Sequence, residues 1–135
     1  MRRSARMRWS EFTEQVRERG EYPSRREAER VIRVVLSALA GQLGRTERHL
    51  LARRLPPEAA RVLITQRPVS RPLAAAEFVD GIAARTEGAT SATARWDASS
   101  VLSVLADGLD RELLDRIIDR LPGGYALLFG RAQLV

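Results

Sequence analysis

The 135-residue sequence contains no cysteine, no lysine and no asparagine, and His49 is its one histidine. Without cysteine the chain can form neither a disulfide nor a thiolate metal site, and one histidine does not complete a zinc site. No apolar run approaches the roughly 20 residues that span a bilayer. The basic leader, residues 1–8, has no apolar segment behind it and therefore does not resemble a secretory signal. We expect a cytoplasmic protein that has no cofactor and no membrane association.

All 23 basic residues are arginines, and the net charge is +6. Residues 1–67 carry 16 arginines and 8 acids, whereas residues 68–135 carry 7 arginines and 9 acids. The charges of the two halves are therefore +8 and −2. A basic surface favours an anionic partner, so the uneven distribution is more informative than the total.

Two patterns recur in the chain at the same offset of 66 positions. Residues 35–40 (Val-Leu-Ser-Ala-Leu-Ala) return as residues 101–106 (Val-Leu-Ser-Val-Leu-Ala), and the Arg-Leu-Pro of residues 54–56 returns at 120–122. Each half is close to the size at which a single core becomes marginal alone. We therefore predict two homologous halves that pack as one domain.

The apolar spacing predicts an all-α fold with about three main helices and a short one in each half. The two repeats pack as one helical bundle in this prediction. The predicted units are a basic N-terminal arm at 1–8, a first repeat at 9–64, a proline-containing linker at 65–72, a second repeat at 73–130 and a tail at 131–135.

Capping and glycine signals set the expected helix ends in the first half. Ser10 is expected to cap the first helix, and Ser24 with Glu27 has the spacing of a capping box. Gly41 and Gly44 are expected to stop the long second helix. The stripe of this helix that we expect to face the core consists of Ile32, Leu36, Leu39 and Leu43.

The chain resembles a bacterial family known as domain of unknown function 2267. The resemblance rests on the start Trp9-Ser10-Glu11-Phe12, the long Val/Leu/Ala helix and the Leu-Pro that precedes a short apolar helix. It implies a helical unit that is often doubled. These are packing motifs, so the resemblance assigns no catalytic or ligand residue to any position.

Catalysis would require a nucleophile beside a base, or two carboxylates in different environments. His49 is interpreted as a solvated helix residue, and its counterpart 66 positions later is Asp115. Ser37 and Ser103 lie inside apolar helices, where a serine more often bonds a carbonyl one turn back. We therefore predict that the protein is not an enzyme.

Asp115 and Asp119 are one helical turn apart, a spacing that two ligands of a cation could have. Arginines lie three to five positions from them, and local ion pairs would explain the same acids without a metal. We favour local ion pairing. The arginines concerned are Arg111, Arg116 and Arg120.

Two surface features remain as candidate sites. Trp96 replaces Arg30 of the first half and is a candidate contact for a partner, although an intramolecular cover for its ring is the favoured alternative. The other feature is a candidate anion or nucleic-acid surface, which would bind phosphates in a salt-dependent way. It consists of Arg26, Arg30, Arg33, Arg53 and Arg54.

The function predicted from these features is a non-enzymatic interaction or regulatory module that binds a protein partner or itself. One alternative is a nucleic-acid-associated protein that uses the arginine-rich surface of the first repeat. Another is small-molecule binding in the cleft between the repeats, since such clefts commonly form pockets.

Overall fold

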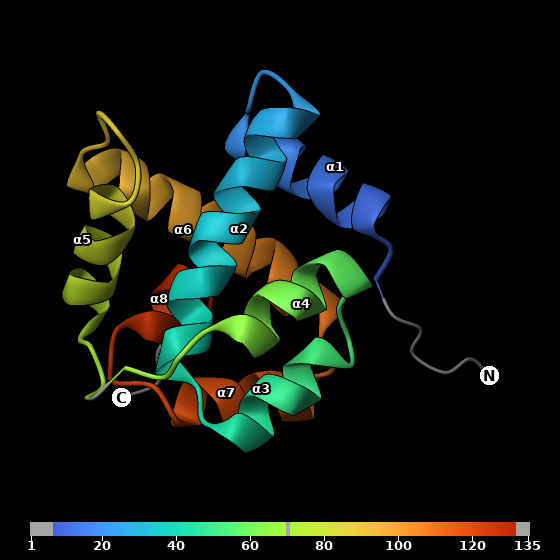
Figure 1. The fold of residues 1–135 in the computed structure, drawn as a ribbon, viewed down its shortest axis with the longest axis vertical. Coiled ribbons are helices and arrows are strands. Elements are labelled where there is room, and N and C mark those ends of the chain that lie inside the picture. The colour runs from blue at the N-terminus through green and yellow to red at the C-terminus, as the bar shows by residue number, and fades with distance from the viewer. Residues whose placement is uncertain (1–6, 70, 132–135) are drawn as a thin grey trace.

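The computed structural model describes residues 7–69 and 71–131. The regular secondary structure of these residues is all helical, as predicted (Figure 1). No helix in this part of the chain is long and apolar enough to cross a membrane. The arginines Arg2, Arg3 and Arg6 of the predicted N-terminal arm lie outside the described residues. The helices are α1 Trp9–Gly20, α2 Arg25–Gln42, α3 Arg45–Ala52, α4 Pro57–Thr65, α5 Ala75–Ala84, α6 Ser91–Gly108, α7 Arg111–Asp119 and α8 Tyr125–Leu128.

The first three helices of each half begin 66 positions apart. Trp9 corresponds to Ala75, α2 and α6 begin at residues 25 and 91, and α3 and α7 begin at residues 45 and 111. Both α2 and α6 contain 18 residues. An internal duplication would produce this agreement, and the common origin of the halves stays a prediction.

Side-chain caps start both long helices. The Ser24 hydroxyl accepts the backbone N–H of Glu27 at 3.1 Å, which confirms the predicted cap of α2. Thr90, the counterpart of Ser24, caps α6 by accepting the N–H of Thr93 at 3.1 Å. The second contact of the predicted capping box is replaced, because the Glu27 carboxylate pairs with Arg30 one turn later.

The predicted cap at Ser10 is wrong. The first helix already includes Trp9, and Arg8 stands at the cap position with an extended backbone. The N–H of Phe12 donates to the carbonyl oxygen of Arg8 at 2.9 Å, so the hydrogen-bonded ladder starts before Ser10. Ser10 instead offers its own carbonyl oxygen to the Thr13 hydroxyl at 3.1 Å.

Gly41 does not stop α2, which continues to Gln42 and ends where Leu43 turns extended. The glycine instead allows another segment to approach closely. A Cβ atom at Gly41 would lie 3.4 Å from a methyl of Val69, and the Val69 N–H donates to the Gly41 carbonyl oxygen at 2.9 Å. The second predicted stop, Gly44, is the N-cap residue of α3.

The two long helices form the centre of the molecule. α2 packs against α6, α1 contacts both of them, and α5 does the same from the other side. α3 and α7 contact each other at one end (Figure 1). The expected stripe Ile32, Leu36, Leu39 and Leu43 is buried in the same hydrophobic cluster as Val101, Leu102 and Leu105 of α6.

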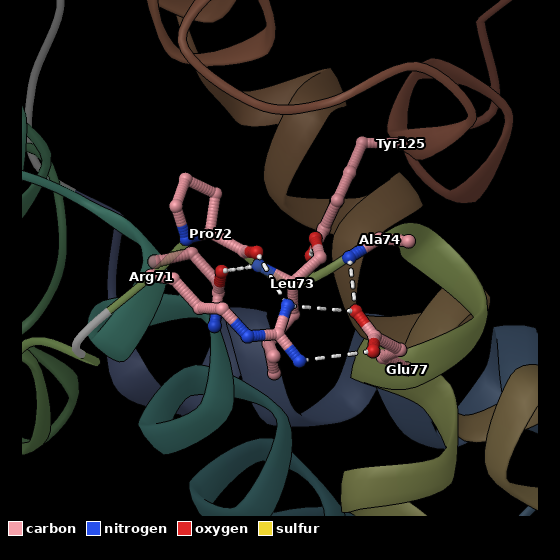
Figure 2. Close-up of polar contacts among 7 residues, drawn as sticks. Arg71, Pro72, Leu73, Ala74, Glu77 and Tyr125 are labelled. Atoms are coloured by element: carbon pink, nitrogen blue, oxygen red, sulfur yellow. Dashed lines mark hydrogen bonds and ion pairs between the residues drawn. The ribbon is translucent and has the colours of Figure 1, made fainter.

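The segment between α4 and α5 is held to both halves (Figure 2). The N–H of Leu73 donates to the side-chain oxygen of Gln42 at 2.9 Å, and its carbonyl oxygen accepts the Tyr125 hydroxyl at 2.9 Å. Arg71 pairs with Glu77 at 3.2 Å. These contacts fasten the connection to α2, α5 and α8, so the halves share more than their common core.

Candidate functional site

The five predicted arginines do not form one surface. Arg26, Arg30 and Arg33 lie on α2, which begins at the top of Figure 1. Arg53 and Arg54 follow α3, which lies at the bottom of the same view. The sequence places these residues in one half, but the direction of α2 separates them.

Three of these arginines are engaged within the protein. Arg30 pairs with Glu27, and this hydrogen-bonded pairing lowers the pKa of the carboxyl group. The guanidinium of Arg33 lies 5.8 Å from the ring centroid of Trp9, within the range of a cation–π contact. Arg54 lies 3.4 Å from a carboxylate oxygen of the second half. Nucleic-acid binding by this set stays a prediction.

Trp96 has both an internal contact and an exposed ring. Its indole N–H donates to the Gly20 carbonyl oxygen at 3.0 Å, while 52% of the residue remains exposed. The next residue, Asp97, accepts the Tyr22 hydroxyl at 2.6 Å, and burial raises the pKa of this carboxyl group. The polar edge of Trp96 therefore helps to join α6 to the α1–α2 turn, and its role as a partner contact stays a prediction.

The interpretation of Asp115 and Asp119 as partners of local arginines is wrong. Arg116 and Arg120 instead turn to Glu47 of α3, with Nε–Oε2 distances of 3.1 and 3.5 Å. Glu47 is only 3% exposed, so its charge requires partners that exposed aspartates can obtain from water. Among the described residues, neither aspartate has an arginine within ion-pair distance.

The buried Glu47 links the two halves electrostatically. Burial raises its pKa, but a backbone hydrogen bond, the hydrogen bond from Arg116 and the positive charge of Arg120 together outweigh burial and lower it. The carboxylate is therefore ionised at neutral pH and holds α3 against α7. The sequence analysis does not identify Glu47 as a link between the halves, because its counterpart in the second half is the apolar residue Leu113.

A groove of 1110 Å³ lies at the surface beside the end of α6, α7 and α8. We call it the α7 groove. Most of its apolar residues are buried, and Ile118 and Pro122 are partly exposed. The apolar lining residues are Ala106, Leu109, Leu114, Ile118, Leu121, Pro122 and Ala126.

The α7 groove is open partly because the last helix is short. In the first half, α4 has nine residues and packs along α3. Its counterpart α8 has four residues, and its contacts with other helices are mainly with α6. The face of α7 that corresponds to the covered face of α3 therefore lacks a long neighbouring helix, although Leu114 and Ile117 on it are buried.

A single residue difference also distinguishes the two halves. Arg48 of α3 corresponds to Leu114 of α7, and the arginine is only 7% exposed. Its Nη2 donates to the carbonyl oxygens of Ala40 at 2.6 Å and Leu43 at 3.4 Å, and its Nη1 donates to that of Gln66. A leucine side chain has no donor with which to hold these groups.

The carbonyl contact at Gln66 fixes an extended segment of residues 66–69 against the end of α2. The Val69 N–H completes this attachment at the Gly41 carbonyl oxygen, 2.9 Å away. The space that remains beside this segment is a pocket of 90 Å³. The surface of the first half that corresponds to part of the α7 groove is therefore occupied by the chain itself.

Charged side chains line the rim of the α7 groove: Asp107, Arg111, Asp115, Asp119 and Arg131. Asp107 pairs with Arg131 at 3.6 Å and with Arg19 of α1 at 3.0 Å. In the part of the chain that the structure describes, no group of three or more acidic or histidine side chains could hold a metal ion.

A smaller cleft of 350 Å³ lies between α3 and α7. It contains Arg53 and Arg54 of the predicted surface together with Asp110, Glu112 and Arg116. Arg54 is paired with Asp110, and Arg116 with the buried carboxylate of α3. Small-molecule binding in this cleft between the halves stays a prediction.

Sequence reasoning did not find the α7 groove. Two signals in the sequence distinguish the halves at this place: Arg48 against Leu114, and the prolines Pro56 and Pro57 against Pro122 and Gly123. Neither signal indicates that residues 66–69 cover the surface of the first half while no described segment covers the α7 groove. That difference depends on tertiary contacts made by residues 66–69.

Comparison with known proteins supplies a family but no activity. A family model described as "Uncharacterized conserved protein (DUF2267)" matches residues 9–128. The match covers most of the chain and confirms the resemblance drawn from the packing motifs. No curated protein matches the sequence.

Proposed function

We propose that this chain, which belongs to the DUF2267 family, is a non-enzymatic module that binds a segment of a partner protein in the α7 groove. The observation that carries the proposal is the contrast between the two halves. The first half holds an extended segment, residues 66–69, whereas no segment of the described residues covers the groove of 1110 Å³ in the second half, and the counterparts of 66–69, residues 132–135, lie outside the described residues. The molecule itself thus contains an example of the kind of ligand that such a surface accepts.

The composition of the α7 groove also supports binding rather than catalysis. Its lining combines apolar side chains with carboxylates and guanidinium groups, and it contains no serine, threonine, histidine or cysteine. Mixed polar and apolar linings of this kind occur at protein–protein contacts. His49 is exposed on α3 and does not line the groove.

A labelled peptide tests this proposal. The probe has the sequence of residues 65–72 with both arginines replaced by glutamine, so it has no charged side chain, and it carries fluorescein at its amino end. We expect fluorescence anisotropy to rise in a saturable way with the full-length protein. The Ile118→Arg variant should abolish binding, because Ile118 lines the groove and is half-buried, so the longer side chain would fill the space without entering the core.

The matched control is Ile64→Arg, which adds the same side chain at an exposed position of α4. This variant should bind the peptide like the wild type, and circular dichroism should show that both variants are folded. Absence of saturable binding to the wild type, or equal binding by Ile118→Arg, would contradict the proposal.

A further inference from the structure

We infer that the pocket of 90 Å³ between α2, α5 and the segment that joins α4 to α5 binds the phosphoryl group of a small phosphorylated ligand. We call it the α5 pocket. The guanidinium groups of Arg67 and Arg85 hold the phosphoryl group, and Ser37 and Gln42 supply further donors. None of the residues that line the α7 groove lines this pocket, so the inference does not depend on the proposed function.

The lining of the α5 pocket carries positive charge only. Arg67 and Arg85 both line it, and no acidic residue does. Among the described residues, neither arginine forms an ion pair. Glu77 in the first turn of α5 is already engaged, since it pairs with Arg71 at 3.2 Å and accepts the Ala74 N–H at 2.9 Å (Figure 2). Two positive charges at one pocket repel each other, and an anion between them removes this cost.

The corresponding junction elsewhere in the molecule shows what Arg85 lacks. The contact of α1 with α6 corresponds to that of α5 with α2, and at the first of these junctions Arg19 pairs with Asp107 at 3.0 Å. Their counterparts 66 positions away are Arg85 and Gly41, and both of these line the α5 pocket. The arginine is present at both junctions, whereas glycine replaces the aspartate at the second. An anion from solution can therefore take the place of the missing carboxylate.

The same comparison accounts for the space in the α5 pocket. Gly81 of α5 corresponds to Gln15 of α1, and a Cβ atom at Gly81 would have no other atom within 4 Å. Both α5 and α2 therefore contribute a glycine to the pocket, and α5 contacts α2 less extensively than α1 contacts α6. A volume of 90 Å³ holds several water-sized groups, which is enough for a phosphoryl group.

The donors of the α5 pocket favour a phosphoryl group over a carboxylate. The planar set of donors in arginine matches either oxyanion, but two guanidinium groups balance the nearly two charges of a phosphate monoester at neutral pH. The side-chain oxygen of Gln42 accepts the Leu73 N–H at 2.9 Å, so its amide N–H groups remain as donors beside the Ser37 hydroxyl. A single carboxylate would leave one of the two positive charges without a partner.

An NMR titration of the full-length, ¹⁵N-labelled protein with inorganic phosphate tests this site. At pH 7.5 and low salt, where phosphate is mainly doubly charged, we expect saturable shifts that are largest at the amide signals of Gly41, Gly81 and Arg85. Methyl phosphate should bind about as tightly, because a monoester retains three terminal oxygens. Acetate should bind at least about fivefold more weakly, since it carries one charge and two oxygens.

Variants locate the binding in the α5 pocket. Arg85→Gln should weaken phosphate binding about fivefold, and Arg67→Gln/Arg85→Gln should abolish it. The matched control Arg26→Gln removes an exposed arginine at the other end of α2 and should bind like the wild type. Gly81→Gln introduces the side chain that α1 has at this position and should block phosphate by filling the pocket. This variant should remain folded, because glutamine is a better helix former than glycine; circular dichroism checks this.

Three results would overturn the inference. The first is the absence of saturable shifts with phosphate, or equal binding by Arg67→Gln/Arg85→Gln and the wild type. The second is binding of acetate as tight as that of phosphate. The third is a single-stranded DNA oligonucleotide that binds more tightly than methyl phosphate and loses this binding in the same double variant, because the ligand would then be a nucleic-acid backbone. The peptide measurement tests the α7 groove separately, so either proposal can fail without the other.

Discussion

The two halves place matching helices around one core but treat the surface beside α3 and α7 in opposite ways. In the first half, the buried guanidinium of Arg48 binds three carbonyl oxygens and holds residues 66–69 against the end of α2. In the second half, Leu114 occupies the corresponding position and the surface is an open groove. One surface is therefore used within the fold, and we propose that the other binds a ligand.

This difference shows where specificity can arise in a molecule with two similar halves. The apolar faces of α2 and α6 are buried in the same cluster, so they stabilise the fold and contact no partner. The ends of the helices are not constrained in this way. An arginine can bind several carbonyl groups at once through its planar set of donors, whereas a leucine only adds apolar surface. A change at such a position alters a surface without changing the core.

The largest effect that we predict is the loss of the first half's internal attachment. Arg48→Ala should lower the free energy of unfolding by about 3 kcal/mol, because three carbonyl groups lose a charged donor and remain partly buried. Urea unfolding followed by circular dichroism measures this change. The same variant should make residues 66–69 more accessible to proteolysis, since the contact at Gln66 is removed.

Arg45→Ala is the matched control for this measurement. Arg45 is an exposed arginine in the first turn of the same helix, and its replacement should change the free energy of unfolding by less than about 0.5 kcal/mol. Equal stabilities of the two variants would show that Arg48 does not hold the segment, and the contrast between the halves would lose its physical basis.

A smaller effect is expected where the halves meet at Glu47. Glu47→Gln should lower the free energy of unfolding at pH 7 by about 1 kcal/mol, because Arg116 and Arg120 lose a charged acceptor but remain well hydrated. The comparison variant is Glu112→Gln, which removes an exposed carboxylate of α7 and should have almost no effect. Thermal or urea unfolding at low salt distinguishes them.

The pH dependence of the Glu47 effect has a defined sign. The pKa of Glu47 is lower in the folded protein than its ordinary value, so ionisation of this group favours folding. The stability difference between wild type and Glu47→Gln should be fully present above the unfolded pKa of about 4.3. It should decrease as the pH falls through the lower pKa of the folded state. A difference that grows in acid would contradict the assigned shift.

Much of the fold could be predicted from local patterns in the sequence. The stripe of α2, the cap at Ser24 and the all-helical class follow from spacing and residue type, which act over one or two helical turns. The predictions for Ser10 and Gly41 are wrong for different reasons, one local and one that involves a distant segment. Arg8 starts the first helix earlier, and the approach of Val69 explains the glycine.

The candidate site could be predicted much less well. Trp96 and the arginines are conspicuous residue types, but their partners come from distant parts of the chain, as Gly20 does for Trp96. The α7 groove depends on a helix that is short and, among the described residues, on a segment that covers the first half but has no described counterpart in the second. Local spacing contains neither fact, since both result from how the segment between the halves packs.

The smallest predicted effect concerns Trp96 and its counterpart Arg30. Trp96→Phe should lower the free energy of unfolding by about 1 kcal/mol, because the Gly20 carbonyl oxygen loses the indole N–H at 3.0 Å while most of the ring contact is retained. Arg30→Ala removes one arginine from an exposed ion pair and should cost less than about 0.5 kcal/mol. Urea unfolding of both variants gives the comparison.

These two variants also show whether Trp96 has a different role from Arg30. If Trp96→Phe is as stable as the wild type, the indole contact with α1 does not contribute to the fold, and the exposed ring becomes a stronger candidate for a partner. If the variant is destabilised and still binds the labelled peptide normally, Trp96 serves to join α6 to the α1–α2 turn. The second result is expected, because Trp96 does not line the α7 groove.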